Sequence, residues 1–520
     1  MQTDVQSLAA RHDPAAVDQL RRQVRELWAA GNLSAAYAVA WDAFAQHGDD
    51  RKIKWVLTEL LRWAPAGLEA ERRAAYLKLL IDPEVEPDMI NSAGWRLALE
   101  GQSETVADAA LPAFAAHCES DELALELLRQ APVGLAAAER LLTHVRRWLL
   151  LSGRWQEFPA LVLALKTQAG LNGGAWTFSE EERAQFADPE NAGMAAAYLP
   201  PRPEPDAAPI PGADPVTRAV TAQYEGYPYP VWTRFTRREP QRLTDMVHKM
   251  DPVLAARLPV AANILVAGCG TGRQAAAVAA AFPDAIVTAI DVSQASLNYA
   301  KRACARLGIG GIRFERLDLH DVAALGQRFD CIYCSGVLHH LPDPERGWKH
   351  LVDVLAPDGV MSIMVYNLIA RLRVRGGRGV IADLMGKPID DDLLRRVRAR
   401  ILERTDHPLA QHTARSRDFP TLAGAYDLLL HRHEDPFDLP RIARALDALG
   451  LRLLHFELLT PAAEARYAAA VPDDPERRDI KKWMRYEREH PGLDLGNYVF
   501  WCGRTADEVV AKGPACTRTQ

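Results

Sequence analysis

The chain has no long uninterrupted apolar run. No stretch of its 520 residues approaches the ~18 apolar residues that a membrane helix needs. Its first residues, MQTDVQSLAARHD, also lack the basic region and apolar core of a signal peptide. We therefore expect no membrane span, no secretion and a cytoplasmic location.

Strong net charge is also absent. The formal net charge is −6 and no domain is basic, so no long-range field draws the chain to nucleic acid. The sequence has no NPPY-type tetrapeptide that would stack on a flipped base. These absences argue against a nucleic-acid partner.

Cysteine is scarce and scattered. Seven cysteines are spread along the chain, a pattern that does not suggest a disulfide framework. Cys331 and Cys334 form a CxxC, but they lie in the expected strand FDCIYC, where residues three apart point to opposite faces. His431, His433 and Glu434 lack a further histidine at helical spacing. We expect no metal site.

Composition changes along the chain. The N-terminal part is rich in Ala, Leu, Arg and Glu at helical spacing, a proline-rich stretch follows, and short β-branched strands then alternate with helices. A mostly helical insertion interrupts the strand-bearing part, where such insertions commonly cap an active site. The expected limits are residues 1–195 for the helical domain, 196–215 for the linker, 216–504 for the strand-bearing domain with its insertion at about 366–450, and 505–520 for a tail.

The helical part contains paired helices. In VDQLRRQVRELWAAGNLSAAYAVAWDAFAQHG a first helix ends before a turn at Gly31 and Asn32, and a second begins near Ser34. The pairing resembles tetratricopeptide-like repeats, but no clean period aligns along the chain. A stacked repeat array and a plain helical bundle both remain open.

Three closely spaced glycines follow the first apolar strand. In ILVAGCGTGR, Gly268, Gly270 and Gly272 form GxGxG and precede an Ala-rich helix. Glycines at this place let the main chain pass close to a ligand, which then meets the amides of the helix N-terminus. Arg273 stands where the dinucleotide fingerprint needs glycine, and no GK[ST] of a phosphate loop follows.

Two acidic residues end the next strands. AIVTAIDV leads to Asp291, which is placed to accept hydrogen bonds from two ribose hydroxyls. IRFERLDL leads to Asp318, in position to accept an adenine amino group. Each acid could instead cap a helix or a loop. Their combination with the glycines at one spacing favours nucleoside binding.

Together these motifs resemble the class I S-adenosylmethionine-dependent methyltransferases. The resemblance rests on VAGCGTG, Asp291, LDL at 317–319, GVLHHLPDP at 336–344 and LAPDGVMSIMVYN at 355–367. It implies an α/β Rossmann-like domain with a seven-stranded sheet, one strand of which is antiparallel, preceded by the all-α domain. Further motifs, such as SRDF and YEREHPGLDLGNYVFW, resemble bacterial proteins that join tetratricopeptide-like helices to such a domain.

The resemblance implies S-adenosyl-L-methionine as the cofactor. The glycines are expected to contact its methionine portion, the acid of the second strand its ribose, and the acid of the third strand its adenine. The expected cofactor-binding residues are Gly268, Gly270, Gly272, Asp291, Val292, Asp318, Leu319 and Ser335.

Candidate catalytic residues follow from the chemistry of methyl transfer. The reaction is an in-line displacement at a sulfonium, and a protonated acceptor also needs a base. His339 follows the fourth strand, Tyr366 ends the fifth, and Tyr229 belongs to QYEGYPYPVW before the first strand. We expect these three to be catalytic. The alternatives are that His339 shapes its loop, that Tyr366 only ends a strand, and that the Tyr229 segment ties the linker to the sheet.

Four arginines open the insertion. Arg371, Arg373, Arg375 and Arg378 surround paired glycines. A solvated basic face is the favoured interpretation, and an anchor for an acidic substrate is the alternative.

Three functions fit the sequence. The leading one is methyl transfer to a protein or peptide acceptor that the helical domain recruits, because helical-hairpin arrays have concave surfaces suited to extended chains. The second is methylation of a small molecule, with the helices serving homodimerisation, since GVLHHLPDP is commoner in small-molecule enzymes. The third is a non-catalytic adaptor or cofactor-sensing protein, which Ala267 favours because the family usually has Asp or Glu there.

Overall fold

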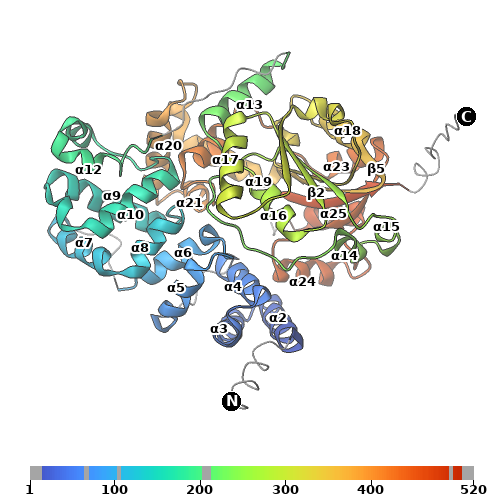
Figure 1. The fold of residues 1–520 in the computed structure, drawn as a ribbon, viewed down its shortest axis with the longest axis horizontal. Coiled ribbons are helices and arrows are strands. Elements are labelled where there is room, and N and C mark those ends of the chain that lie inside the picture. The colour runs from blue at the N-terminus through green and yellow to red at the C-terminus, as the bar shows by residue number, and fades with distance from the viewer. Residues whose placement is uncertain (1–13, 64–69, 102–106, 202–211, 491–495, 506–520) are drawn as a thin grey trace, which may run out of the picture. The chain divides into compact units, whose positions relative to one another are not determined.

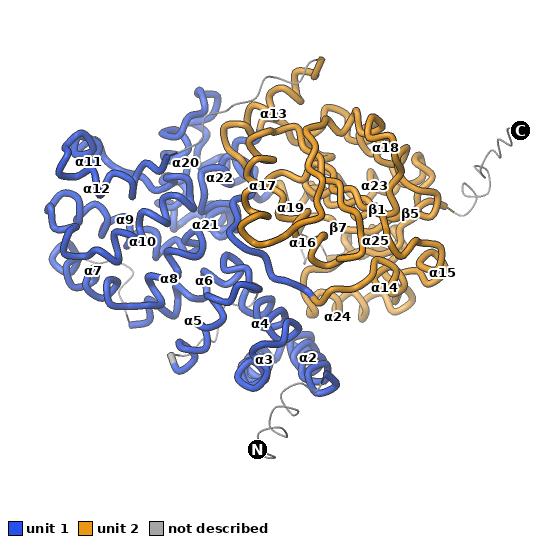
Figure 2. Tube along the Cα trace, viewed as in Figure 1, with its two compact units in different colours: residues 1–204, 229–238, 373–431 blue, residues 205–228, 239–372, 432–520 orange. Residues whose placement is uncertain are grey.

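The structure is a computed structural model that describes residues 14–63, 70–101, 107–201, 212–490 and 496–505 (Figure 1). The chain divides into two compact units, drawn in different colours in Figure 2. Unit 1 comprises residues 1–204, 229–238 and 373–431, and unit 2 comprises residues 205–228, 239–372 and 432–520. Parts of the expected linker and tail, residues 202–211 and 506–520, lie outside the described residues.

Unit 2 is built on one seven-stranded sheet with the order β3-β2-β1-β4-β5-β7-β6. The first five strands pair in parallel, and β7 is antiparallel to both β5 and β6. This topology confirms the expected Rossmann-like sheet with one antiparallel strand. The strands are β1 (Asn263–Ala267), β2 (Ile286–Asp291), β3 (Ile312–Arg316), β4 (Phe329–Ser335), β5 (Leu355–Val365), β6 (Leu451–Phe456) and β7 (Tyr498–Arg504).

The central strands are buried on both faces, which explains their nearly continuous apolar sequences. Along β1, Leu265 lies in one hydrophobic core and Val266 lies in the other. Cys331 and Cys334 of β4 are likewise split between the two cores, as the strand period predicts. The helices of unit 2 include α13 (Pro215–Gly226), α14 (Leu243–His248), α15 (Pro252–Ala255), α16 (Arg273–Ala281), α17 (Gln294–Arg306), α18 (Pro344–Val354), α23 (Leu439–Ala448), α24 (Pro461–Ala470) and α25 (Ile480–Glu489).

Unit 1 confirms a helical domain before the sheet. The predicted turn is present: Gly31 has φ +77°, and Asn32 caps α3 by accepting a hydrogen bond from the Ala35 amide. Alternate helices contact one another in chain order, α2 with α4, α4 with α6, α6 with α8, and α8 with α10, as in stacked hairpins. A tetratricopeptide-like repeat stays a prediction. The helices are α2 (Pro14–Ala29), α3 (Leu33–His47), α4 (Arg51–Trp63), α5 (Arg73–Ile81), α6 (Pro87–Ala98), α7 (Leu111–Ser120), α8 (Glu122–Gln130), α9 (Ala136–Leu151), α10 (Pro159–Asn172), α11 (Glu180–Ala184) and α12 (Ala192–Ala195).

Most of the expected insertion belongs to unit 1, which differs from the predicted domain limits. It contains α20 (Asp391–Glu403), α21 (Pro408–Ala414) and α22 (Leu422–Leu430), while α19 (Leu368–Arg378) crosses the boundary between the units. The physical reason is a buried ion pair. Both terminal nitrogens of Arg398 on α20 bind the carboxylate of Glu139 on α9, at 2.9 and 2.8 Å. A buried guanidinium must be paired, so this segment packs with the helices that carry its partner.

A short segment of residues 229–238, which forms neither helix nor strand, also belongs to unit 1. Arg234 donates from Nη2 to the Leu80 carbonyl at 2.7 Å, and Thr233 donates from its hydroxyl to the Gln130 carbonyl at 3.0 Å. The helical array therefore holds an extended piece of its own chain.

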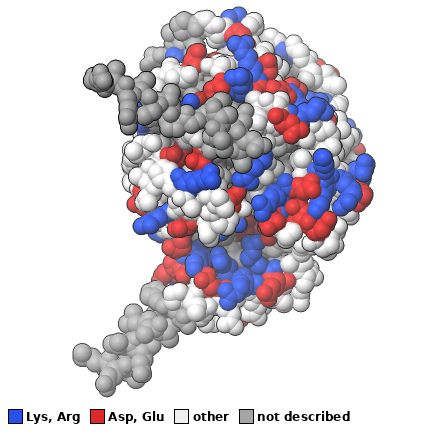
Figure 3. Space-filling view, turned by 90° about the vertical axis from the view of Figure 1, so that its right-hand side faces the viewer, with Lys and Arg blue, Asp and Glu red and all other residues white. Residues whose placement is uncertain are grey.

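None of the described helices is both long and apolar enough to cross a bilayer. On the face drawn in Figure 3, basic and acidic side chains are interspersed.

Candidate cofactor and acceptor site

The glycine loop joins β1 to α16 and is shaped for a close approach of the main chain. Gly268 has φ +64°, and a Cβ there would lie 2.3 Å from Cγ2 of Val337. Gly272 has φ +83°, and its Cβ would lie 2.5 Å from Cβ of Ala300 on α17. Glycine is required at both positions, because the left-handed conformation and the overlap both exclude a side chain.

Asp291 ends β2 and binds the glycine loop. Its Oδ2 accepts from the Gly270 amide at 2.7 Å, and its Oδ1 accepts from the Ser293 amide at 2.9 Å. Burial raises the pKa of Asp291 to about 6, against the lowering effect of these backbone hydrogen bonds. β1 itself ends in two buried apolar residues, Val266 and Ala267. The carboxylate that binds the glycine loop therefore comes from β2.

Asp318 follows β3 and caps a 3₁₀ helix, Leu319–Leu325. Its Oδ1 accepts from both the amide and the Nδ1 of His320, each at 2.9 Å. Burial by itself would raise the pKa of Asp318, but the hydrogen bonds from His320 outweigh it and lower that pKa, while they raise the pKa of His320. The capping role anticipated as an alternative is therefore present, and the carboxylate is held ionised.

Two of the remaining expected cofactor residues, Val292 and Leu319, directly follow these acids in the chain, and the third, Ser335, ends β4. Leu319 is buried, and the Val292 carbonyl accepts from Nε of Arg316 at 3.1 Å. Ser335 ends β4, and its hydroxyl accepts from Nε2 of Gln274 at 2.9 Å. Sequence reasoning missed Gln274, although its place in the first turn after the glycine loop could have drawn attention to it.

His339 and Tyr366 meet where β4 and β5 end. Their rings stack with centroids 3.8 Å apart, and the Tyr366 amide donates to Nδ1 of His339 at 3.2 Å. His339 is fully buried, and its carbonyl accepts from the Asp435 amide at 2.8 Å. The neutral His339 ring must then carry its proton on Nε2, because Nδ1 accepts.

The neighbouring His340 has the opposite tautomer. Its Nδ1 lies 2.8 Å from the carbonyl oxygen of His433, and a carbonyl can only accept, so Nδ1 carries the proton. The His340 ring packs edge-on against Tyr366, with centroids 5.4 Å apart. In the neutral form, the Nε2 of His340 therefore has the lone pair, whereas that of His339 is a donor.

The arginine cluster divides between the units. Arg371 lies in unit 2, where its guanidinium stacks 4.5 Å from the Tyr366 ring centroid and pairs with Glu434. It is only 4% exposed, so the expected solvated face is wrong for this residue. Arg373, Arg375 and Arg378 belong to unit 1.

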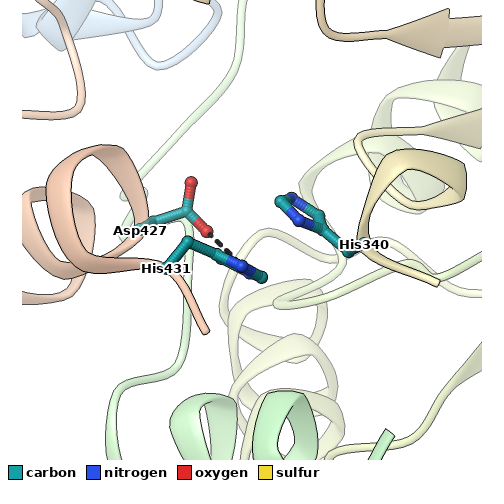
Figure 4. Close-up of side chains that lie close together, drawn as sticks. All are labelled: His340, Asp427 and His431. Carbon is teal, nitrogen blue, oxygen red and sulfur yellow. Dashed lines mark ion pairs between the residues drawn. The ribbon is translucent and has the colours of Figure 1, made fainter. Parts of the chain in front are cut away.

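Tyr229, the third expected catalytic residue, belongs to unit 1. Its hydroxyl donates to the Asp418 carboxylate. In the same unit, His431 pairs with Asp427 at 3.9 Å, as drawn in Figure 4. Within unit 2 the structure thus brings His339 together with Tyr366, and Tyr229 is described with unit 1.

Comparisons with known proteins add the family. The model of a family described as a methyltransferase domain matches residues 264–359, which contain the glycine loop and both acids. A protein of Synechococcus sp. is 30% identical over 318 residues, which cover 56% of this chain and 73% of that protein. The chain belongs to the family of this Synechococcus protein. Within that family, residues 264–359 of the chain are a methyltransferase domain.

The chain also matches named methyltransferases over shorter lengths. Trans-aconitate 2-methyltransferase of Deinococcus radiodurans is 36% identical over 104 residues, 20% of this chain and 38% of that enzyme. Ubiquinone biosynthesis O-methyltransferase of Coxiella burnetii is 31% identical over 105 residues, 20% of this chain and 44% of that enzyme. The chain therefore spans less than half the length of these two relatives. The solved structure of PKMT2 from Rickettsia typhi in complex with AdoHcy is 15% identical, with TM-score 0.38, and covers 50% of this chain and 52% of that one.

Proposed function

We propose that the protein transfers a methyl group from S-adenosyl-L-methionine to an acceptor. The observation that carries this proposal is the placement of Asp291, which ends β2 and binds the amide of Gly270 in a loop where Gly268 and Gly272 leave no room for a side chain. A buried carboxylate beside a glycine loop, with a second at Asp318, matches the two polar ends of an adenosine. The cofactor of this domain is S-adenosyl-L-methionine.

The chain's own residues have distinct tasks toward that cofactor. The three glycines leave room for its methionine portion, and the amides at the start of α16 face it. Asp291 and Val292 receive the ribose, Asp318 and Leu319 the adenine, and Ser335 lies at the end of β4. When bound, the cofactor supplies a methyl group on a positively charged sulfur.

The acceptor meets the methyl group beside Tyr366. His339 is buried and bonded to the Tyr366 amide, so its task is to hold the ring of Tyr366, and it stays a candidate donor through Nε2. A base needs an unprotonated nitrogen, which is Nε2 in neutral His340, whereas in neutral His339 it is the Nδ1 that already accepts from the Tyr366 amide. Proton removal from a protonated acceptor therefore falls to His340 in this proposal. Tyr229, held by Asp418 in unit 1, is a candidate for acceptor binding rather than for proton transfer.

The acceptor class that we propose first is a protein or peptide recruited by unit 1. The support is that the helical array already binds an extended segment, residues 229–238, through backbone carbonyls. Surfaces built from stacked helical hairpins are suited to extended chains. An added peptide would use contacts of the same kind.

A small-molecule acceptor is the second candidate. One observation in its favour is the stack of the Tyr366 ring on the buried ring of His339. A second is that two relatives are named for small molecules, trans-aconitate 2-methyltransferase and ubiquinone biosynthesis O-methyltransferase. In this case the helices would serve stability or homodimerisation. A non-catalytic adaptor that only senses the cofactor is the third.

One experiment separates these candidates. The full chain is incubated with methyl-labelled S-adenosyl-L-methionine and a cell extract, which is then separated into protein and small-molecule fractions. Label in protein that disappears with Asp291→Ala supports the first acceptor class, and label in the small-molecule fraction that disappears with the same variant supports the second. Cofactor binding without label in either fraction supports the adaptor.

A further inference from the structure

Helix α13 lies beside the cofactor-binding acids, although it precedes the methyltransferase domain in the chain. Its residues Pro215–Gly226 pack against α17, whose N-terminus follows β2 (Figure 1). Asp214 caps α13 by accepting from the amides of Val216 and Thr217 at 2.8 and 3.0 Å. The helix is thus held at its start by its own cap.

Glu225, near the end of α13, binds the beginning of α17 with both carboxylate oxygens. Its Oε1 accepts from the Gln294 amide at 2.6 Å, and its Oε2 accepts from the Ala295 amide at 3.2 Å. These two residues open α17, three and four positions after Asp291. Amides at a helix N-terminus favour a carboxylate strongly, so this pair of bonds fixes α13 on the ribose side of the site.

A further contact joins α13 to the segment that follows α22. The buried side chain of Gln223 accepts from the Arg432 amide at 3.2 Å. The loop that begins at Arg432 also supplies the His433 carbonyl that binds His340. One helix therefore contacts both the start of α17 and the segment that binds His340.

We propose that Glu225 is a positioning residue for the cofactor: its bonds to the N-terminus of α17 hold α13 over the ribose and place a second carboxylate beside Asp291. The inference rests on the proposed function and adds a residue that lies outside the matched methyltransferase domain.

The two carboxylates act on each other. Besides Glu225 on α13, the ionisable and charged groups near Asp291 are Cys269 of the glycine loop and Arg316 of β3, whose guanidinium bonds the adjacent Val292 carbonyl. Burial is the main cause of the raised pKa of Asp291, and the charge of Glu225 raises it further. Removal of the Glu225 charge should therefore lower the pKa of Asp291, whereas a change of shape alone should not.

The test is calorimetric titration of the full chain with S-adenosylhomocysteine between pH 5 and 8. Glu225→Gln removes the charge, and Glu225→Asp keeps the charge but shortens its reach. The matched control is Glu464→Gln on α24, another helix of unit 2, and it breaks a 3.3 Å pair with Arg477.

We expect Glu225→Gln to weaken binding at pH 8 by about fivefold, the effect of losing a hydrogen bond to a charged group. The pH midpoint of its affinity should fall, because the charge of Glu225 contributes to the raised pKa of Asp291. Glu225→Asp should weaken binding with an unchanged midpoint, and the control should match the wild type. A Glu225→Gln profile with the wild-type midpoint would overturn the proposal, because it would leave Glu225 a purely structural role. Failure of the wild type itself to bind would instead refute the proposed function.

Discussion

Gly272→Ala is the substitution whose effect follows most directly from the geometry of the loop. Gly272 caps α16 with φ +83° and ψ 7°. An added Cβ would lie 2.5 Å from Cβ and 3.2 Å from Cα of Ala300 on α17. The new methyl group therefore meets backbone as well as a side chain, which no rotamer change can relieve.

Two costs add up at this position. A non-glycine residue in the left-handed region costs roughly 1–2 kcal/mol. To reach ordinary contact at 3.4 Å, the gap to Ala300 must widen by about 1 Å, and such overpacking costs about 1–3 kcal/mol. We expect Gly272→Ala to lower the free energy of unfolding by about 2–5 kcal/mol and to abolish binding of S-adenosylhomocysteine.

Urea unfolding of three variants separates the two costs. Gly308→Ala has φ +65° with nothing within 4 Å, so it should show the conformational cost alone, about 1–2 kcal/mol. Gly310→Ala has neither feature and should lie within about 0.5 kcal/mol of the wild type. If Gly272→Ala is no more destabilising than Gly308→Ala, the argument from close approach is refuted.

Three other predictions follow from single side chains. Arg398→Met should destabilise unit 1 by about 3–5 kcal/mol, because it leaves the carboxylate of Glu139 buried and unpaired, and adding Glu139→Leu should recover most of the loss in urea unfolding. Because the pKa of Asp291 is raised from 3.8 to about 6, its ionisation should cost the ligand-free protein about 3 kcal/mol of stability as the pH rises from 4 to 8. In urea unfolding, the midpoint of the wild type should therefore fall as the pH rises, and that of Asp291→Ala should not. The affinity of the wild type for S-adenosylhomocysteine should rise as the pH passes 6. Tyr366→Phe should keep the stack on His339 and the melting temperature, whereas Tyr366→Leu should lose about 1–3 kcal/mol, and equal stability of the two would contradict the role given to the stack.

Much of unit 2 could be predicted because its signals are local. Apolar runs mark strands that are buried on both faces, and the positive φ values of the glycine loop need glycine wherever the fold is used. Asp291 and Asp318 could be located because parallel strands end at one edge. These inferences need only short sequence windows.

The other features depend on partners far away in the chain. Arg398 reads as one more basic residue of an amphipathic helix until Glu139, 259 positions earlier, is seen to bind it. For the same reason the sequence that makes Tyr229 a candidate catalytic residue does not show that its hydroxyl binds Asp418, 189 positions later. Nor does the sequence around Glu225 show that its carboxylate reaches the N-terminus of α17, because tertiary packing alone decides that contact.

The measurement that tests the central claim most directly is calorimetric titration of the full chain with S-adenosyl-L-methionine and S-adenosylhomocysteine, beside the variant Asp291→Ala. We predict micromolar binding of both ligands by the wild type and a loss of at least about tenfold in the variant, since the substitution removes the carboxylate that we propose as the acceptor of the two ribose hydroxyls. Absence of binding to the wild type, or equal affinity of the variant, would contradict the assignment of this edge of the sheet as the cofactor site.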